Sequence, residues 1–355
     1  MIALYAGFLV GVVALLALDL GVLRRGTGEV GVRAALGWTA AWVAVALAFA
    51  GFLYAGYEHG WLGLGTTPDA SSQARAVAGG APIYNDGRDA VIKYLTGFAV
   101  EKALAIDNVF VIATIFAALG VPPALQRRVL TWGIVGALVM RGAMIGVGAA
   151  LLHRFGWLLD VFGVILVLTG VKLALARADA TPAAGSGGLA RLVRRWLPVT
   201  QALHGERFWV RAGRVPADGD RALARARPGA RVATPLLLAL ILVEASDAIF
   251  AADSIPAIFA ITTDPFLVFT SNVLAMLGLR SLYFALAAMI ARFRYLQRAL
   301  AVVLVAIGAK LLAHDALVGW LGGHLHVVTM GLIAAVLAGG VAASVWIPPR
   351  AAPAA

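Results

Sequence analysis

Cysteine is absent from all 355 residues, which excludes disulfides, thiolate nucleophiles and thiolate metal sites. Charge is scarce as well, because only 13% of residues are charged, against roughly 25% in soluble domains. The chain also lacks a Walker motif, a GxSxG nucleophile turn and an HExxH zinc motif. We therefore expect no enzymatic activity and no permanently bound cofactor, and any metal must be held by oxygen or imidazole ligands.

Apolar residues make up 61% of the chain and form several runs near or above the ~20 residues that cross a bilayer. The sequence therefore predicts an all-α polytopic membrane protein with one transmembrane domain over residues 1–355. The first run lacks a basic n-region and a cleavage site, so we expect it to be a retained span. We predict about nine transmembrane helices, at residues 2–22, 35–57, 93–119, 129–152, 157–176, 234–260, 267–291, 296–314 and 326–347.

Lysine and arginine are unevenly divided between the predicted connecting segments. With the N-terminus outside, the inward segments carry 20 of them and the outward segments carry four. The positive-inside rule then predicts an outer N-terminus and an inner C-terminus. Segment 58–92 is rich in Gly, Ala, Ser and Asp, so we expect a mobile outward loop there.

Eleven arginines gather in segment 177–233, which we interpret as a cytoplasmic loop rather than as a nucleic-acid site. Its residues 189–199 fit either a short amphipathic helix lying on an anionic leaflet or a plain solvated linker.

Ionisable landmarks recur within the predicted spans. An Asp, an Arg and a Lys follow one another at spacings of 34 and 31 residues in one stretch and 33 and 30 in the other, as Asp107, Arg141 and Lys172, then Asp247, Arg280 and Lys310. Each stretch holds three helices, so the second would cross the membrane in the opposite direction. The pattern predicts an inverted repeat of residues 93–176 and 234–314, with a substrate site near the midplane. Chance similarity between apolar helices is the alternative.

Eleven charged residues of the predicted spans are candidates for a polar interior, because each would cost roughly 2.5–3.5 kcal/mol if it faced lipid at a helix centre. We expect them to face one another or water instead. The acids are Asp19, Glu101, Asp107, Glu244, Asp247 and Asp253, and the bases are Lys102, Arg141, Lys172, Arg280 and Lys310. Carboxylate, amide and hydroxyl oxygens suit Mn²⁺, Ca²⁺ or Mg²⁺. Static ion pairing is an alternative, and we expect both, with some acids paired to the bases and the rest binding a cation. A proton relay is a further alternative.

The segment "VEASDAIFAADSIP" concentrates three of these acids before a proline. Glu244 and Asp247 share one helix face, whereas Asp253 lies about 120° away on an ideal helix. Pro256 removes a backbone hydrogen bond, so we expect a helix break that turns Asp253 toward the other acids. The metal would then lie nearest this helix, with helix 93–119 closing over it.

Four stretches together resemble the TerC family of integral membrane proteins, which is named for tellurium resistance and includes the Alx manganese exporters. They are "FAVEKALAIDNVFVIATIFAALGVP", "LTWGIVGALVMRGAMIGVGAALL", "LVEASDAIFAADSIPAIFAITTDPFLVFTSNVLAMLGLRSLYFAL" and "LVAIGAKLL". The resemblance implies Mn²⁺ export across a bacterial inner membrane. By position it implies a metal-binding set of Glu101, Asp107, Asn108, Glu244, Asp247, Asp253 and Ser254. Pairing or gating would fall to Lys102, Arg141, Lys172, Arg280, Lys310 and Asp19.

Our leading hypothesis from the sequence is a secondary exporter of Mn²⁺, working against protons. Tellurite resistance would be a phenotype only, because the chain has no thiol to reduce tellurite. A Ca²⁺ transporter keeps the same site and changes the ion. A membrane scaffold or chaperone-like factor, with a structural charged core and an Arg-rich loop that docks a partner, is the alternative from another class.

Overall fold

The computed structural model describes residues 2–23, 32–69, 84–155, 157–175, 188–213, 220–287, 294–313, 317, 320 and 325–346. Helices dominate these residues. The long ones are α1 (Ile2–Leu23), α2 (Val32–Glu58), α4 (Gly87–Ala118), α5 (Pro123–Arg154), α6 (Leu158–Leu175), α9 (Pro235–Phe259), α10 (Pro265–Met276), α11 (Leu279–Ala287), α12 (Arg294–Leu312) and α14 (Leu325–Trp346).

Among the described residues, five stretches are long and apolar enough to cross a membrane, namely Arg33–Glu58, Pro123–Leu152, Leu158–Leu175, Pro235–Phe259 and Pro265–Ala285. The predicted class, a multi-pass helical membrane protein, is therefore correct. The full set of nine spans stays a prediction.

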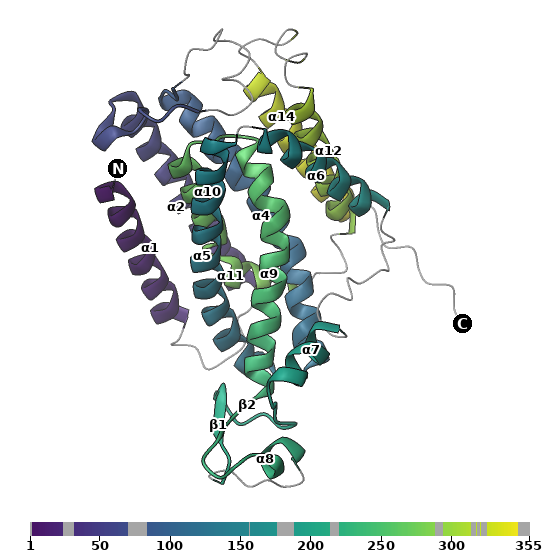
Figure 1. Ribbon diagram of the computed structural model, residues 1–355. Coiled ribbons are helices and arrows are strands. Elements are labelled where there is room, and N and C mark those ends of the chain that lie inside the picture. Colours follow the sequence, from purple (N-terminus) through teal and green to yellow (C-terminus); the bar gives the residue numbers. More distant parts are fainter. Residues whose placement is uncertain are drawn as a thin grey trace.

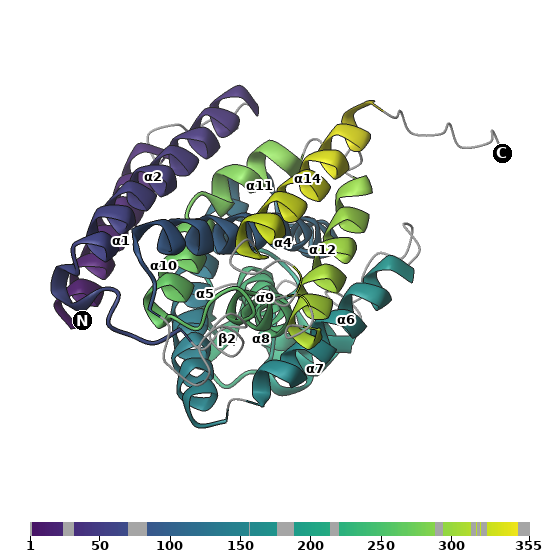
Figure 2. The ribbon, with the colours of Figure 1, turned by 90° about the horizontal axis from the view of Figure 1, so that it is seen from above.

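The helices form a bundle around α4, α5, α9 and α10, with α1 and α2 along one side and α6, α12 and α14 along the other (Figures 1 and 2). The α10–α11 stretch is almost wholly buried, whereas only about a fifth of the α5 and α6 spans is buried. Large apolar side chains such as Val139 and Leu168 are exposed on those outer helices. A lipid-facing surface needs such side chains, so the bundle has a protein-enclosed centre and an apolar exterior.

The predicted helix break lies in a different helix from the one we expected. Helix α9 runs through Pro256 to Phe259, because the proline sits only one turn from its end and removes a single hydrogen bond. The predicted continuous helix over 267–291 is instead divided between α10 and α11. Gly278 makes this division, since its φ of 81° suits glycine and a Cβ there would lie 2.6 Å from Trp42 Cδ1.

Helices α6 and α12 touch backbone to backbone through paired small residues. A Cβ built on Gly308 would lie 2.7 Å from the Gly163 carbonyl oxygen, and one built on Gly170 would lie 2.8 Å from the Ala301 carbonyl oxygen. Residue 301 follows residue 163 by 138 positions, and residue 308 follows residue 170 by the same number. Helices α6 and α12 are partners in the predicted repeat, so replacing each by the other turns the first contact into the second. The order of the two contacts also shows that the helices run antiparallel.

Part of the Arg-rich segment is folded. Strands β1 (Trp209–Arg211) and β2 (Arg231–Ala233) pair antiparallel, with Val210 opposite Val232. Beside them lies α8 (Arg221–Arg225), and α7 (Gly188–Trp196) occupies most of the predicted amphipathic stretch (Figure 1). For residues 188–196 the helix is therefore correct and the plain linker is wrong.

Candidate functional site

Arg141 lies buried at the centre of the bundle, where α4, α5, α9 and α10 meet. Its Nη2 and Nε donate to the two oxygens of Asp247 at 2.9 and 3.2 Å, and its Nη1 donates to Glu101 Oε1. Nη1 also donates to Asn272 Oδ1 at 3.0 Å and reaches Ser254 Oγ at 3.4 Å. One guanidinium from α5 thus holds side chains from three other helices. We call these five residues, together with Asn108, the Arg141 cluster.

Two buried oxygens of this cluster have no hydrogen-bond partner among the described residues. Asn108 donates from Nδ2 to Asp247 Oδ1 at 3.1 Å, which leaves Asn108 Oδ1 unpartnered, and Glu101 Oε2 is unpartnered too. Buried polar atoms are normally paired, because an unmade hydrogen bond in a dry interior costs about 1–3 kcal/mol. Two such unpaired acceptor oxygens close to one arginine indicate a site that could bind an additional cation.

A cavity of about 20 Å³ adjoins the cluster on the side where α4 ends and α5 begins. That volume is enough for one water molecule or ion. Asn108, Asp247 and Glu244 line it, together with Arg280 and several apolar side chains. The Glu244 carboxylate lies against the bare backbone of α5, since a Cβ on Gly136 would fall well inside contact distance of it.

Lys102 pairs with backbone rather than with a described acid. Its Nζ donates to the carbonyl oxygens of Ala275 and Leu277 at 2.9 and 3.2 Å. These carbonyls are available because the helix divides at Gly278, and a cation at a helix C-terminus also suits the helix dipole. Nothing in the sequence indicated this pairing, because the helix break was expected in α9.

The remaining predicted residues lie apart from this cluster or outside the described residues. Arg280 is buried, borders the cavity and lies 3.4 Å from Thr131 Oγ1, whereas Lys172 is exposed on α6. Lys310 is buried near Lys93. The side chains of Asp19, Asp107 and Asp253 lie outside the described residues.

Of the predicted metal set, the structure thus brings together Glu101, Asn108, Asp247 and Ser254, with Glu244 at the cavity. Within the described part of the chain, no three acidic or histidine side chains gather closely enough to hold a metal by themselves. Asn272, which was only a weak candidate from the sequence, completes the cluster. Its repeat counterpart is a glycine, and the available signal was a single amide in an apolar helix.

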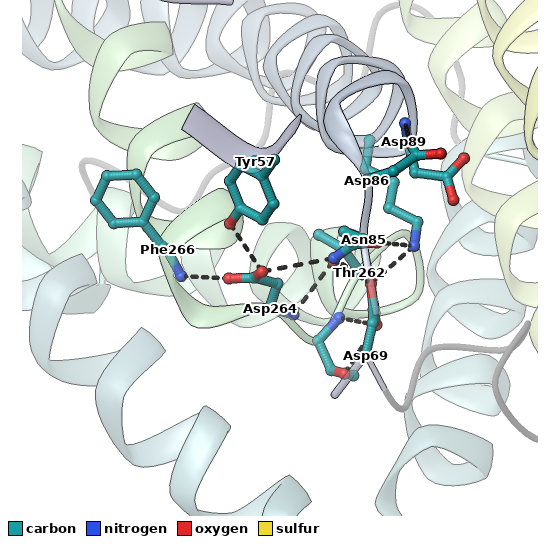
Figure 3. Close-up of polar contacts among 10 residues, drawn as sticks. Tyr57, Asp69, Asn85, Asp86, Asp89, Thr262, Asp264 and Phe266 are labelled. Carbon is teal, nitrogen blue, oxygen red and sulfur yellow. Dashed lines mark hydrogen bonds and ion pairs between the residues drawn. The ribbon is translucent and has the colours of Figure 1, made fainter. Parts of the chain in front are cut away.

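A second buried ionic cluster lies where α4 begins and α9 ends (Figure 3). Asp69 accepts from Lys93 Nζ at 2.9 Å, from Thr262 Oγ1 at 2.6 Å, and from both the backbone N and Oγ1 of Thr263 at 2.9 Å. Asn85 Nδ2 donates to it at 3.2 Å. Burial raises the pKa of Asp69, but Lys93 and the donors from residues 262 and 263 outweigh it and hold that pKa well below its usual range.

This Asp69 cluster continues to the start of α10. Tyr57 Oη donates to Asp264 Oδ2 at 2.8 Å, while Asp264 Oδ1 caps α10 by accepting from the backbone N of Phe266 at 3.0 Å (Figure 3). Residues 64–69 and 84–86 are therefore part of an ordered, hydrogen-bonded region, and the mobile loop predicted for 58–92 is wrong for these residues. The sequence missed the cluster because its members are spread over four separate segments.

Comparison with known proteins shows the family of this chain. Residues 86–352 match the integral membrane protein TerC family, so the chain belongs to that family. An uncharacterised membrane protein of Myxococcus xanthus is 44% identical over 313 residues, covering 88% of this chain and 84% of its own. Two proteins named membrane-bound redox modulator Alx, from Salmonella typhi and Escherichia coli K12, are 44% and 42% identical, each covering 88% of this chain and 86% of its own. No solved structure matches significantly.

Proposed function

We propose that this TerC-family chain is a secondary transporter that exports a divalent metal cation, Mn²⁺ in preference to Ca²⁺, across the bacterial cytoplasmic membrane. One observation carries the proposal. Asn108, whose buried Oδ1 lacks a described partner, lines a small cavity together with Glu244 and Asp247, and Glu101 Oε2, which also lacks a described partner, belongs to the same Arg141 cluster. Ionisable residues buried within a membrane protein are functional by default, because they are too costly to retain otherwise.

The chemistry of the donors supports a hard cation. Carboxylate, amide and hydroxyl oxygens bind Mn²⁺ and Ca²⁺ well, whereas the absence of cysteine disfavours Cu(I) and Zn²⁺. The TerC resemblance favours Mn²⁺ between the two remaining ions. A redox effect, as the name of the Alx relatives describes, cannot run through thiols in this chain. A change in metal supply offers an indirect route.

The helix arrangement supports transport by alternating access. The contacts between α6 and α12 exchange under the predicted repeat, as an inverted repeat about an axis in the membrane plane requires. In the predicted repeat, α4 corresponds to α9 and α5 corresponds to α10. The packing of α4 on α10 therefore corresponds to the packing of α9 on α5, and both are present. The division at Gly278 is a broken helix beside the proposed site, which is a common feature of such transporters. Glu244, at the cavity, is the residue we propose to carry protons in the opposite direction.

Transport can be measured as Mn²⁺ release from vesicles containing the purified protein. We expect Asp247→Asn to release Mn²⁺ at least about tenfold more slowly, because the variant loses a charged ligand and the main partner of Arg141. Glu206→Gln is the matched control, since Glu206 is an exposed carboxylate outside the bundle. Normal release by Asp247→Asn would contradict the site, and equal release of Ca²⁺ in competition would contradict the choice of ion.

A further inference from the structure

Arg141 occupies the oxygens that a metal would need. Its guanidinium takes both oxygens of Asp247 and one of Glu101, and it also reaches Ser254. A divalent cation bound to these carboxylates would lie next to a fixed positive charge in a region with little water, where like charges repel strongly. The guanidinium and the metal therefore compete for the same two carboxylates.

The surroundings of Arg141 allow that competition to be resolved in either direction. On the α10 side, Asn272 Oδ1 accepts from Nη1 at 3.0 Å, and this amide is neutral. On the other side of the carboxylates lies the cavity, bordered by Asn108, whose Oδ1 has no described partner. The Asp247 carboxylate thus has a cation on one side and room for a second cation on the other, while Glu101, on the same guanidinium, keeps one oxygen without a described partner.

We propose that Arg141 is a tethered substitute for the transported ion. Without metal, its guanidinium pairs with both Glu101 and Asp247 and offsets one of their two negative charges. When metal enters from the cavity, the guanidinium withdraws toward Asn272 and Ser254 and leaves the carboxylates to the metal. This inference rests on the proposed transport function and assigns Arg141 a positioning role within it.

The consequence concerns the return step of the transport cycle. A transporter that gives net export must change its orientation while empty, whereas exchange of labelled for unlabelled ion uses only the loaded form. Without Arg141, the empty form would carry two buried carboxylates that have lost their described ion pairs, which is strongly unfavourable. The loaded form would be unaffected, because the metal neutralises the same two groups. Arg141 is therefore needed for net export and dispensable for exchange.

The test compares net release with exchange of radioactive Mn²⁺ from vesicles that hold the full chain. We expect Arg141→Gln to reduce net release at least about tenfold while exchange stays within about threefold of the native rate. Arg195→Gln is the matched control, because Arg195 is an exposed arginine on α7 and both modes should persist. Equal loss of both modes, or retention of both, would overturn the proposal.

A binding measurement separates this role from a purely structural one. Titration calorimetry of the purified Arg141→Gln protein should show Mn²⁺ affinity raised at least about fivefold, since a competing cation has been removed. A structural arginine would give weaker binding, and that result would overturn the proposal even if transport were lost through misfolding.

The double variant Glu101→Gln/Arg141→Gln restores the charge balance of the empty site. We expect the net release rate of the double variant to be at least about threefold higher than that of Arg141→Gln alone. No recovery would contradict the charge argument. If the native protein moves Mn²⁺ in neither mode, the proposed function itself fails. If the native protein transports Mn²⁺ and Arg141→Gln slows net release and exchange equally, only this inference is rejected.

Discussion

Two buried ion pairs, built from the same chemistry, differ in how completely their oxygens are satisfied. Asp69 receives Lys93 together with hydroxyl, backbone and amide donors on both of its carboxylate oxygens. In the Arg141 cluster, by contrast, Glu101 Oε2 and Asn108 Oδ1 have no described partner. A fully hydrogen-bonded polar network makes a structure rigid, whereas a network with unpaired buried atoms is energetically costly unless a ligand binds there. This difference indicates that the Asp69 cluster has a structural role and that the Arg141 cluster is a binding site.

Location agrees with this division of roles. The Asp69 cluster ties the end of α2, residues 64–69, the start of α4 and the turn between α9 and α10 to one another (Figure 3). The Arg141 cluster lies further along α4, and its cavity is on the side away from Asp69. One end of the bundle is therefore held together by a fully hydrogen-bonded ionic network, while the centre contains oxygens without a described hydrogen-bond partner.

Removing the acid of the saturated cluster should give the largest loss of stability. Asp69→Ala leaves the Lys93 ammonium buried, with Asn85 as its remaining described partner. We expect the free energy of unfolding to fall by about 3–5 kcal/mol, as is typical when one partner of a buried pair is removed. Thermal unfolding in detergent would measure it, with Asp160→Ala on the exposed face of α6 as control. A loss below about 1 kcal/mol would show that water reaches the cluster and that the contrast with Arg141 is false.

A single methyl group tests the other side of the comparison. Gly136→Ala places a Cβ against the Glu244 carboxylate, so the side chain must move within the cavity. We expect a loss of about 1–3 kcal/mol from overpacking, together with slower Mn²⁺ release from vesicles.

Gly146→Ala on the same helix is the matched control, because nothing lies within 4 Å of its Cβ. It should be neutral or stabilising by about 0.5–1 kcal/mol. Identical effects of the two substitutions would mean that Glu244 does not depend on the space beside Gly136.

The central cluster was easier to predict than the saturated one for a physical reason. Charges within apolar runs are costly, so Glu101, Arg141 and Asp247 stand out in the sequence and must find partners. Lys93 and Asp69 lie at or beyond the ends of apolar runs, where charge is ordinary, and nothing local indicates that they are buried. Asn272 was only a weak candidate, because one amide gives a weak signal without its tertiary contacts.

Helix boundaries followed apolar length, but the position of the break did not follow the proline. Pro256 costs one hydrogen bond near a helix end, and the remaining turn tolerates it. Gly278 permits a positive φ and a close approach to Trp42, and both requirements come from tertiary packing. A glycine inside an apolar run is common, so the sequence could not distinguish this one from the others.

The smallest effect should come from an ion pair that water can reach. Arg128 Nη1 lies 3.0 Å from Glu206 Oε2, with the two side chains 39% and 68% exposed. Glu206→Ala should change the free energy of unfolding by less than about 0.5 kcal/mol, because water replaces the lost contact and Arg128 still stacks on Phe208 at 5.1 Å. The measurement is the same thermal unfolding, repeated at high salt, where any difference should vanish. A salt-resistant loss above about 1 kcal/mol would mean that exposure does not separate the weak ion pair from the strong ones. The Asp69 and Arg141 clusters would then differ only in how completely their polar atoms are hydrogen-bonded.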